Sequence, residues 1–182
     1  MKTLFGFTAV IISAGTFAIL ASPEPSSQAT FLSATDISKA VRHLSATVAT
    51  DQPLRTIDGG TSNVGIFIVH RPQESDQGCT IEHDTLVNDK TTSIFLVLSG
   101  AGTIVTGGKL ANSMPLPPDD PDLKLVGSGS RGSGIQGGES RRITKGDIVI
   151  IPPGVPHGFS AIEKFITYQV LRIDSGKTLP LK

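Results

Sequence analysis

Histidine is the residue type whose positions in this chain suggest chemistry, because a neutral imidazole binds metal ions and exchanges protons near neutral pH. His157 stands three residues after Gly154, the last residue of a Pro-x-Gly turn. His83 alternates with Cys79 and Ile81, which places it on the apolar face of a predicted strand. If both strands line one barrel, the two rings converge in a mostly apolar pocket. There each is either a metal ligand or a structural histidine.

Other side chains extend this predicted pocket. Ser93 shares a strand face with Phe95, so that a neutral hydroxyl and an aromatic ring accompany the histidines. Tyr168 lies on the last strand, where its ring packs in the core or borders the pocket. His70 ends a strand beside Arg71-Pro72 and is expected at the surface, like His43 on the predicted helix.

Short strands joined by turns must position these residues. Ser33 or Thr35 is expected to cap a helix over about residues 35–46, whose apolar residues recur at helical spacing. The segment Gly107–Gly138 is rich in Gly, Pro and Ser and is predicted to be a long excursion, with short strands near Leu123–Val126 and Ile135. The predicted strands are Val64–Val69, Cys79–His83, Ser93–Leu98, Thr103–Thr106, Ile148–Ile151 and Phe165–Ile173. Strands without intervening helices predict a sandwich or a closed antiparallel barrel.

The run Gly146-Asp-Ile-Val-Ile-Ile-Pro152-Pro-Gly154-Val-Pro-His157 has the spacing G-x5-P-x-G-x-x-H. This spacing resembles the second conserved motif of the cupin superfamily. Upstream, Gly78-Cys-Thr-Ile-Glu-His83 and Val97-Leu98-Ser99-Gly100-Ala101-Gly102 resemble the first motif in part. The resemblance covers about residues 60–173 and implies an all-β fold, an antiparallel jelly-roll β-barrel with a short N-terminal helical arm.

The resemblance also implies a metal site, which the family builds from two histidines in H-x-H order, a glutamate and the later histidine. This chain keeps His83 and His157, whereas Thr85 and Ser93 stand where the second histidine and the glutamate would be. The cofactor is therefore a divalent metal (Fe, Mn, Ni or Zn) held by His83 and His157, or none. A third ligand could come from His70 or from the acidic residues Glu82, Asp84 and Asp89.

The N-terminus has the pattern of a secretory signal. Lys2 precedes an uncharged stretch from Leu4 to Ala21, and small residues at Ala21 and Ala29 offer two cleavage sites. We expect residues 1–21 (or 1–29) to be a signal peptide, 30–58 a helical arm, 59–174 the barrel domain and 175–182 a tail. The expected location is secreted or extracytoplasmic, without stable membrane association after cleavage.

Composition narrows the function classes. Sixteen basic residues balance sixteen acidic ones without long runs of either sign, which argues against a nucleic-acid partner. The expected function is that of an enzyme on a small organic molecule, with oxidoreductase, isomerase, lyase and cyclase chemistry all open. The alternative is a non-catalytic barrel that binds a small ligand in a pocket around Ser93, Phe95 and Tyr168. A homodimer also remains open.

Overall fold

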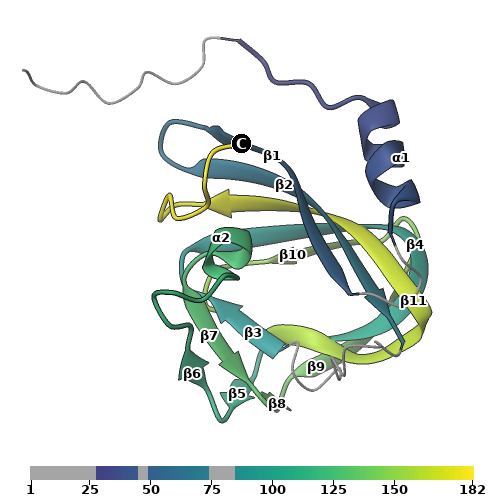
Figure 1. Cartoon of the computed structure of the whole chain (residues 1–182). Helices are drawn as coiled ribbons and strands as arrows, with labels where there is room; N and C mark the ends of the chain where they lie inside the picture. The colour runs from purple at the N-terminus through teal and green to yellow at the C-terminus, as the bar shows by residue number, and fades with distance from the viewer. Residues whose placement is uncertain (1–27, 45–48, 74–84) are drawn as a thin grey trace, which may run out of the picture.

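The structure, a computed structural model, describes residues 28–44, 49–73 and 85–182. Its strands form one nine-stranded antiparallel sheet and a separate two-stranded sheet (Figure 1). In chain order the elements are α1 (Ala34–Arg42), β1 (Thr50–Asp58), β2 (Asn63–Pro72), β3 (Thr85–Asn88), β4 (Thr91–Thr106), β5 (Lys109–Ala111), β6 (Met114–Pro115), α2 (Leu123–Val126), β7 (Gly129–Gly132), β8 (Gly134–Gln136), β9 (Glu139–Thr144), β10 (Ile148–Ile151) and β11 (His157–Asp174). This confirms the predicted all-β fold with a short helical arm.

Two long bent strands, β4 and β11, close the barrel. The first half of β4 pairs with β10 and its second half with β9, while β11 pairs along nearly the whole of β4. The bend in β4 occurs at Gly100, which has φ of 77°. A Cβ atom there would lie 2.1 Å from the carbonyl oxygen of Phe165 on β11, so only glycine fits. The jelly-roll barrel predicted from the sequence is therefore confirmed.

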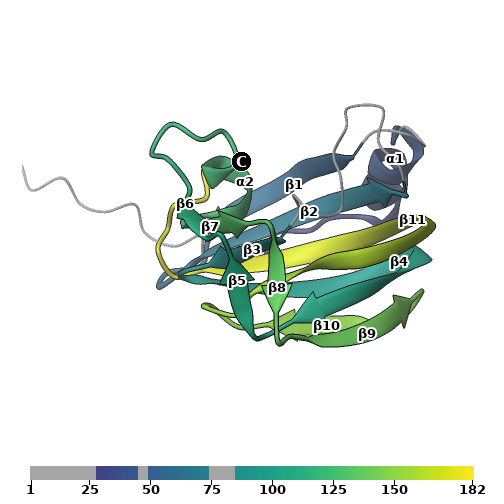
Figure 2. The same cartoon turned by 90° about the horizontal axis from the view of Figure 1, so that it is seen from below.

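The order of strands across the sheet is easiest to follow from below. β1 and β2 lie at one side, β11 and β4 in the middle, and β10 and β9 at the other side (Figure 2). The predicted strands Ser93–Leu98 and Thr103–Thr106 are both parts of β4, because Gly100 bends the strand without ending it. The predicted strand Cys79–His83 lies outside the described residues.

The core lies between the inward faces of these strands. Strand alternation sends every second side chain inward, and the inward set is mainly aliphatic and aromatic. The buried cluster consists of Phe67, Val69, Phe95, Val97, Ile104, Ile143, Ile151, Phe159, Ile162, Ile166, Tyr168, Val170 and Leu179. It draws on strands from both ends of the chain, so the barrel is held together by contacts between residues far apart in sequence.

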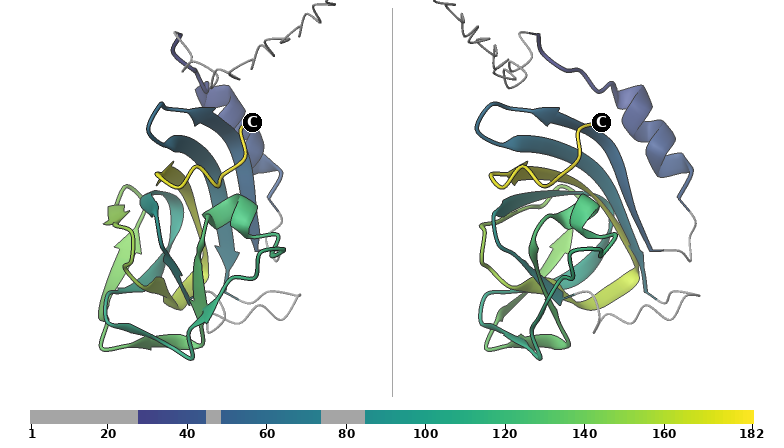
Figure 3. Two further views of the ribbon diagram at one scale, coloured as in Figure 1. Left: turned by 90° about the vertical axis from the view of Figure 1, so that its left-hand side faces the viewer. Right: turned by 60° about the vertical axis from the view of Figure 1, so that its left-hand side comes forward.

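Helix α1 lies on the outer side of β1 and β2, away from the barrel interior (Figure 3). Its N-cap is Ser33, one of the two predicted caps, and Ser33 and Asp36 form a reciprocal capping box. The helix ends at Arg42, before the predicted end near residue 46.

Two predicted assignments differ from the structure. Residues 50–58, assigned to the helical arm, form β1, which pairs with β2 along its length. Leu123–Val126 is the short helix α2 instead of a strand, since a four-residue apolar run cannot by itself separate the two states. In the C-terminal tail, Leu179 is buried, and backbone hydrogen bonds join Lys182 to Thr56.

The turn before His157 has the predicted geometry, whereas the strand before it is less buried than predicted. Gly154 has φ of 78°, a conformation that favours a residue without Cβ. On β10, Ile151 is 2% exposed, but Ile148 and Ile150 are 62% and 65% exposed. An unbroken apolar run such as Ile148–Ile151 predicts a buried strand, whereas the structure buries only its inward face.

Candidate functional site

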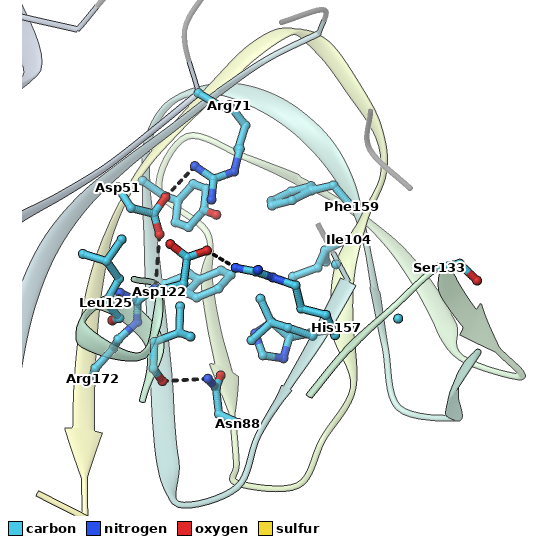
Figure 4. A pocket seen from close by; sticks show the side chains of 18 of the residues that line it. Asp51, Arg71, Asn88, Ile104, Asp122, Leu125, Ser133, His157, Phe159 and Arg172 are labelled. Atoms are coloured by element: carbon cyan, nitrogen blue, oxygen red, sulfur yellow. Dashed lines mark hydrogen bonds and ion pairs between the residues drawn. The ribbon is translucent and has the colours of Figure 1, made fainter. Parts of the chain in front are cut away.

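The barrel encloses a cavity of about 810 Å³. Its walls come mainly from β3, β4, β11 and the segment around α2, and Figure 4 labels ten of the residues that line it. A volume of this size lies within the range of about 300–1,000 Å³ typical of small-molecule sites. The cavity is therefore the candidate functional site.

His157 stands at one side of the cavity because β11 begins at this residue, directly after the Gly154 turn. The side chain is 5% exposed, and its Nδ1 lies 3.0 Å from the backbone oxygen of Val155. A carbonyl oxygen only accepts, so Nδ1 carries the proton and Nε2 is the basic nitrogen of the neutral ring. In this tautomer the ring can accept a proton or bind a metal through Nε2.

Aromatic rings form one wall of the cavity. Phe95 and Tyr168 lie with ring centroids 4.6 Å apart, and Phe159 lies 5.8 Å from Tyr168. Phe95 also meets the ring of His157 edge-on at 6.1 Å. These contacts place the predicted pocket residues Phe95 and Tyr168 beside His157. Ser93 lies on the same inward face of β4 but is 2% exposed and does not line the cavity in the described part of the chain.

The opposite side of the cavity carries a buried cluster of charges. Asp51 on β1 forms ion pairs with Arg71 at 2.6 Å and with Arg172 at 3.5 Å. The Arg172 guanidinium lies 4.4 Å from the centroid of the Phe67 ring and donates a 2.5 Å hydrogen bond to the Leu125 carbonyl. Figure 4 shows Arg71 reaching toward Asp51 from above and Arg172 from below.

The electrostatics of this cluster follow from burial and pairing. Burial raises the pKa of the Asp51 carboxyl, but the charges and hydrogen bonds of Arg71 and Arg172 outweigh it, so the pKa lies below its ordinary value. Burial lowers the pKa of Arg172, an effect that the Asp51 carboxylate opposes. The Asp51 carboxylate thus supplies the negative charge that both guanidinium groups contact.

A second ion pair lies over the cavity. Arg131 on β7 pairs with Asp122 and, at 3.4 Å, with Asp120. Arg131 and Asp122 both line the cavity. The two acidic residues precede α2, so the excursion between β6 and β7 is tied to the barrel by this arginine.

The charge cluster of Asp51, Arg71 and Arg172 was not predicted from the sequence. Arg172 alternates with Tyr168 and Val170 on the inward face of β11, and a charged residue in that position was the available signal. Asp51 gave no signal, because residues 50–58 were assigned to the arm.

His70 was expected at the surface, but it is 5% exposed, with Nδ1 2.8 Å from the Thr167 hydroxyl.

Only some of the predicted metal ligands belong to the described residues. His83 and the candidate third ligands Glu82 and Asp84 lie outside the described residues, and His70 and Asp89 do not line the cavity. In residues 28–44, 49–73 and 85–182 no three His, Cys, Asp or Glu side chains come together as a metal-binding group. Among the described residues, His157 is the one histidine that lines the cavity, and it does not form a metal-binding group with other described side chains.

Fold and cavity define the class of this protein: a small antiparallel jelly-roll barrel with an internal pocket. No protein-family model matches the chain, and no curated protein matches its sequence. Solved structures are similar to the chain, and the three described next share 10–16% sequence identity with it.

Three of these structures illustrate the likeness. The DMSP lyase DddQ from Ruegeria pomeroyi has a TM-score of 0.42 and 16% identity, over 69% of this chain and 47% of DddQ. The cupin domain of Schizosaccharomyces pombe Cnp3 has a TM-score of 0.42 and 10% identity, over 73% of this chain and 66% of that domain. An RmlC-like cupin with a double-stranded β-helix fold from Methanocaldococcus jannaschii has a TM-score of 0.42 and 12% identity, over 74% of this chain and 90% of that protein. The chain spans less than half of DddQ.

Proposed function

We propose that this chain binds a small organic molecule in the barrel cavity. The observation that carries the proposal is a single cavity with an aromatic wall on one side and a buried charge cluster on the other. Small-molecule sites combine such an apolar lining with a few convergent polar groups, which fix the orientation of the ligand. The ligand would pack an apolar or aromatic body against Phe95 and Tyr168.

The charge cluster favours a ligand that carries a hydrogen-bond acceptor. Arg172 lines the cavity, and its buried Nε has no hydrogen-bond acceptor within the described part of the chain. A buried donor of this kind is costly unless a ligand or water satisfies it. The positive charge of the Arg172 guanidinium favours an anionic acceptor, such as a carboxylate, over a neutral one.

The test is titration with anilinonaphthalene sulfonate, a fluorescent aromatic anion. We expect saturable binding that the Leu86→Trp variant weakens by at least about tenfold, because Leu86 lines the cavity and a larger side chain there takes up part of the space open to the ligand. Equal binding by the wild type and this variant, at equal stability, would contradict the proposal.

A matched control addresses the exposed surface of the barrel, since this probe also binds apolar surfaces. Ile150 is 65% exposed on the outside of β10, and Ile150→Thr should leave the cavity titration unchanged. A loss of binding in Ile150→Thr alone would locate the probe outside the barrel and overturn the assignment. Native mass spectrometry of protein from its own source should also reveal a co-purified small molecule.

A second candidate function is chemistry at His157, for which the ring tautomer is the specific observation. The Val155 carbonyl holds the proton on Nδ1, so Nε2 can act as a general base or as a metal ligand. With a third donor beyond His83 and His157, a metal would supply Lewis-acid or redox chemistry. Oxidoreductase, lyase, isomerase and cyclase reactions all remain open for this candidate.

Elemental analysis of purified protein tests the metal assignment. Stoichiometric metal that is lost in both His83→Ala and His157→Ala, but kept in His43→Ala, is the expected result for a site held by these two histidines. Because ligating histidines must be neutral, the affinity should fall as the pH drops through about 6.5. Metal retained in both variants would contradict the assignment.

We also propose that the protein is exported. The proposal rests on the sequence pattern of residues 1–21 and 1–29, which lie outside the described residues. In the part of the chain that the structure covers, no helix is long and apolar enough to cross a membrane. Intact mass of protein from the extracellular or periplasmic fraction should give an N-terminus near Ser22 or Thr30. Met1 retained in a membrane pellet would be the opposite result.

A further inference from the structure

The segment between β6 and β7 forms part of the cavity wall and is held differently from the barrel strands. Leu116–Ser128, which we call the α2 loop, contains α2 and no residue of a strand. Two backbone hydrogen bonds of 2.9 Å fix its ends, one from the Leu116 N–H to the Gly129 oxygen and one from the Asp89 N–H to the Ser128 oxygen. These bonds join only the two ends of the loop to the barrel.

Between its two ends the backbone of the α2 loop bonds to itself. The N–H groups of Asp120 and of residues 123–127 all donate to oxygens inside the loop, and none of the described residues 117–127 takes part in a strand pair. Helix α2 has four residues, far fewer than the ~12–15 that an isolated helix needs in water. The position of the loop therefore depends on side-chain contacts with the barrel instead of sheet pairing.

Two buried polar side chains of the barrel hold the C-terminal half of the α2 loop. Asn88 of β3 donates a 2.8 Å hydrogen bond from its amide nitrogen to the Val126 oxygen. Arg172 of β11 donates one of 2.5 Å to the Leu125 oxygen, and Figure 4 shows the two residues on the same side of the cavity. Both donors also line the cavity, so the groups that hold the loop are groups that a ligand would meet.

A partly exposed ion pair holds the other half of the α2 loop. Arg131 of β7 pairs with Asp122 and, at 3.4 Å, with Asp120. The side chains of Arg131 and Asp122 are 39% and 37% exposed, so water competes for these contacts. This ion pair can therefore break and re-form while β7 stays paired with β3.

Few side chains of the α2 loop are buried. Val126 is the one buried side chain of residues 116–126, and Leu125 is half-buried against the core. By contrast, β4 and β11 pair with each other along nearly the whole of β4. Segments with few buried apolar contacts and a locally bonded backbone open at a lower free energy than core strands do. The α2 loop is thus a part of the cavity wall that can open while the barrel stays folded.

We propose that the α2 loop is a lid over the cavity, which opens about its two anchored ends and is held closed by Asn88, Arg131 and Arg172. In the closed arrangement Leu125 and Val126 line the cavity, so a ligand that contacts them favours closure. The opening of the lid does not depend on a ligand, whereas its role as a gate rests on the proposed function.

Hydrogen–deuterium exchange of the purified protein, followed by mass spectrometry, tests the opening without any ligand. We expect the amides of residues 123–127 to exchange at least about a hundredfold faster than those of β4 and β11. Arg131→Gln, which removes the ion pair, should increase the exchange rate of the loop about two- to fivefold and leave the rates of the strands unchanged.

Two further variants make the exchange experiment specific. Asp120 is not among the described residues that line the cavity, so Asp120→Asn weakens the ion pair without changing the lining. It should also speed exchange in the loop. Arg142→Gln is the matched control, because it breaks an exposed pair with Glu163 on other strands, and it should leave the exchange of the loop unchanged.

Stopped-flow mixing with anilinonaphthalene sulfonate tests the role as a gate. Asp120→Asn should raise the association and dissociation rate constants of the probe together, by about twofold, because the lid opens more often. Removal of a negative charge by itself would instead speed association of the anionic probe and slow its dissociation. Saturating probe should also slow the exchange of residues 123–127 in the wild type.

Two results would overturn the lid: loop amides that exchange no faster than those of β4 and β11, or a loop rate that Arg131→Gln and Asp120→Asn both leave unchanged. Probe rate constants that do not rise together in Asp120→Asn would overturn the gate. A probe that fails to bind, while the exchange of the loop still responds to Arg131→Gln, would contradict the proposed function and support the lid.

Discussion

The two faces of the central strands differ in an unexpected way. On β11, Arg172 and Asp174 point inward and are buried, while their neighbours Leu171 and Ile173 point outward. A half-covered antiparallel sheet ordinarily buries its apolar face and exposes its polar one. Here the inward face holds charges at a cavity, and the outward face holds aliphatic residues. The comparison teaches that each inward charge has its partners inside the barrel: Asp51 for Arg172, and the backbone N–H groups of Gly176, Thr178 and Leu179 for Asp174. The outward aliphatic side chains of Leu171 and Ile173 contact solvent.

The inward charges provide the largest test of this comparison. Asp51→Asn removes the carboxylate that pairs with both Arg71 and Arg172. Breaking a buried ion pair in this way costs about 3–5 kcal/mol of unfolding free energy. Urea unfolding at neutral pH measures the loss.

The matched control is Asp58→Asn on the same strand, where Asp58 pairs with the more exposed Lys177. A much smaller change in the urea midpoint is expected for this variant. If both variants unfolded at the same midpoint, the cluster at the cavity would not be a special feature of the inward face.

Two adjacent isoleucines on β10 allow a direct comparison of the two faces of the sheet. They are the same residue type, but Ile151 points toward the core and Ile150 toward solvent. Ile151 is 2% exposed and Ile150 is 65% exposed. Ile151→Ala should lower the unfolding free energy by about 2–5 kcal/mol through lost burial and a residual cavity. Ile150→Ala should change the unfolding free energy by about 0.5 kcal/mol or less, measured by urea unfolding.

Acid should lower the folding stability by protonating Asp51 on the inward face of the sheet. Because the folded-state pKa of Asp51 lies below its ordinary value, its contribution to stability is present above a pH of about 3.9 and is lost as the pH falls through the folded-state pKa. Thermal melting from neutral pH to about pH 2 should therefore reveal a steep loss below about pH 4. Glu163→Gln, which removes an exposed carboxylate with a lowered pKa, should leave most of that loss in place.

The smallest effect is expected at a surface pair. Arg142 and Glu163 form two hydrogen bonds, of 2.6 and 3.0 Å, but their side chains are 57% and 55% exposed. Water and salt screen such a pair, so Arg142→Ala should leave the melting temperature nearly unchanged. A large destabilisation would mean that surface charges, as well as buried ones, hold the barrel together.

The sequence predicted those features that follow from local periodicity and turn chemistry. Alternation and turn residues located β2, β10 and both halves of β4, and a Ser or Thr cap before apolar residues at helical spacing located α1. The positive φ of Gly154 follows from the same local chemistry. The prediction of a strand at Leu123–Val126 was wrong, because a run of four residues is too short to distinguish a helix from a strand.

The tertiary structure decided what each side chain meets. No spacing along the chain could bring Asp51 to Arg172, because β1 and β11 are separated by β2 in the sheet and by more than a hundred residues in sequence. Likewise, the sequence identified Ile148–Ile151 as an apolar strand, but a run of four isoleucines and valines has no alternation that tells inside from outside. Only the pairing of β10 with β4, at the end of the sheet, turned Ile148 and Ile150 toward solvent and Ile151 toward the core.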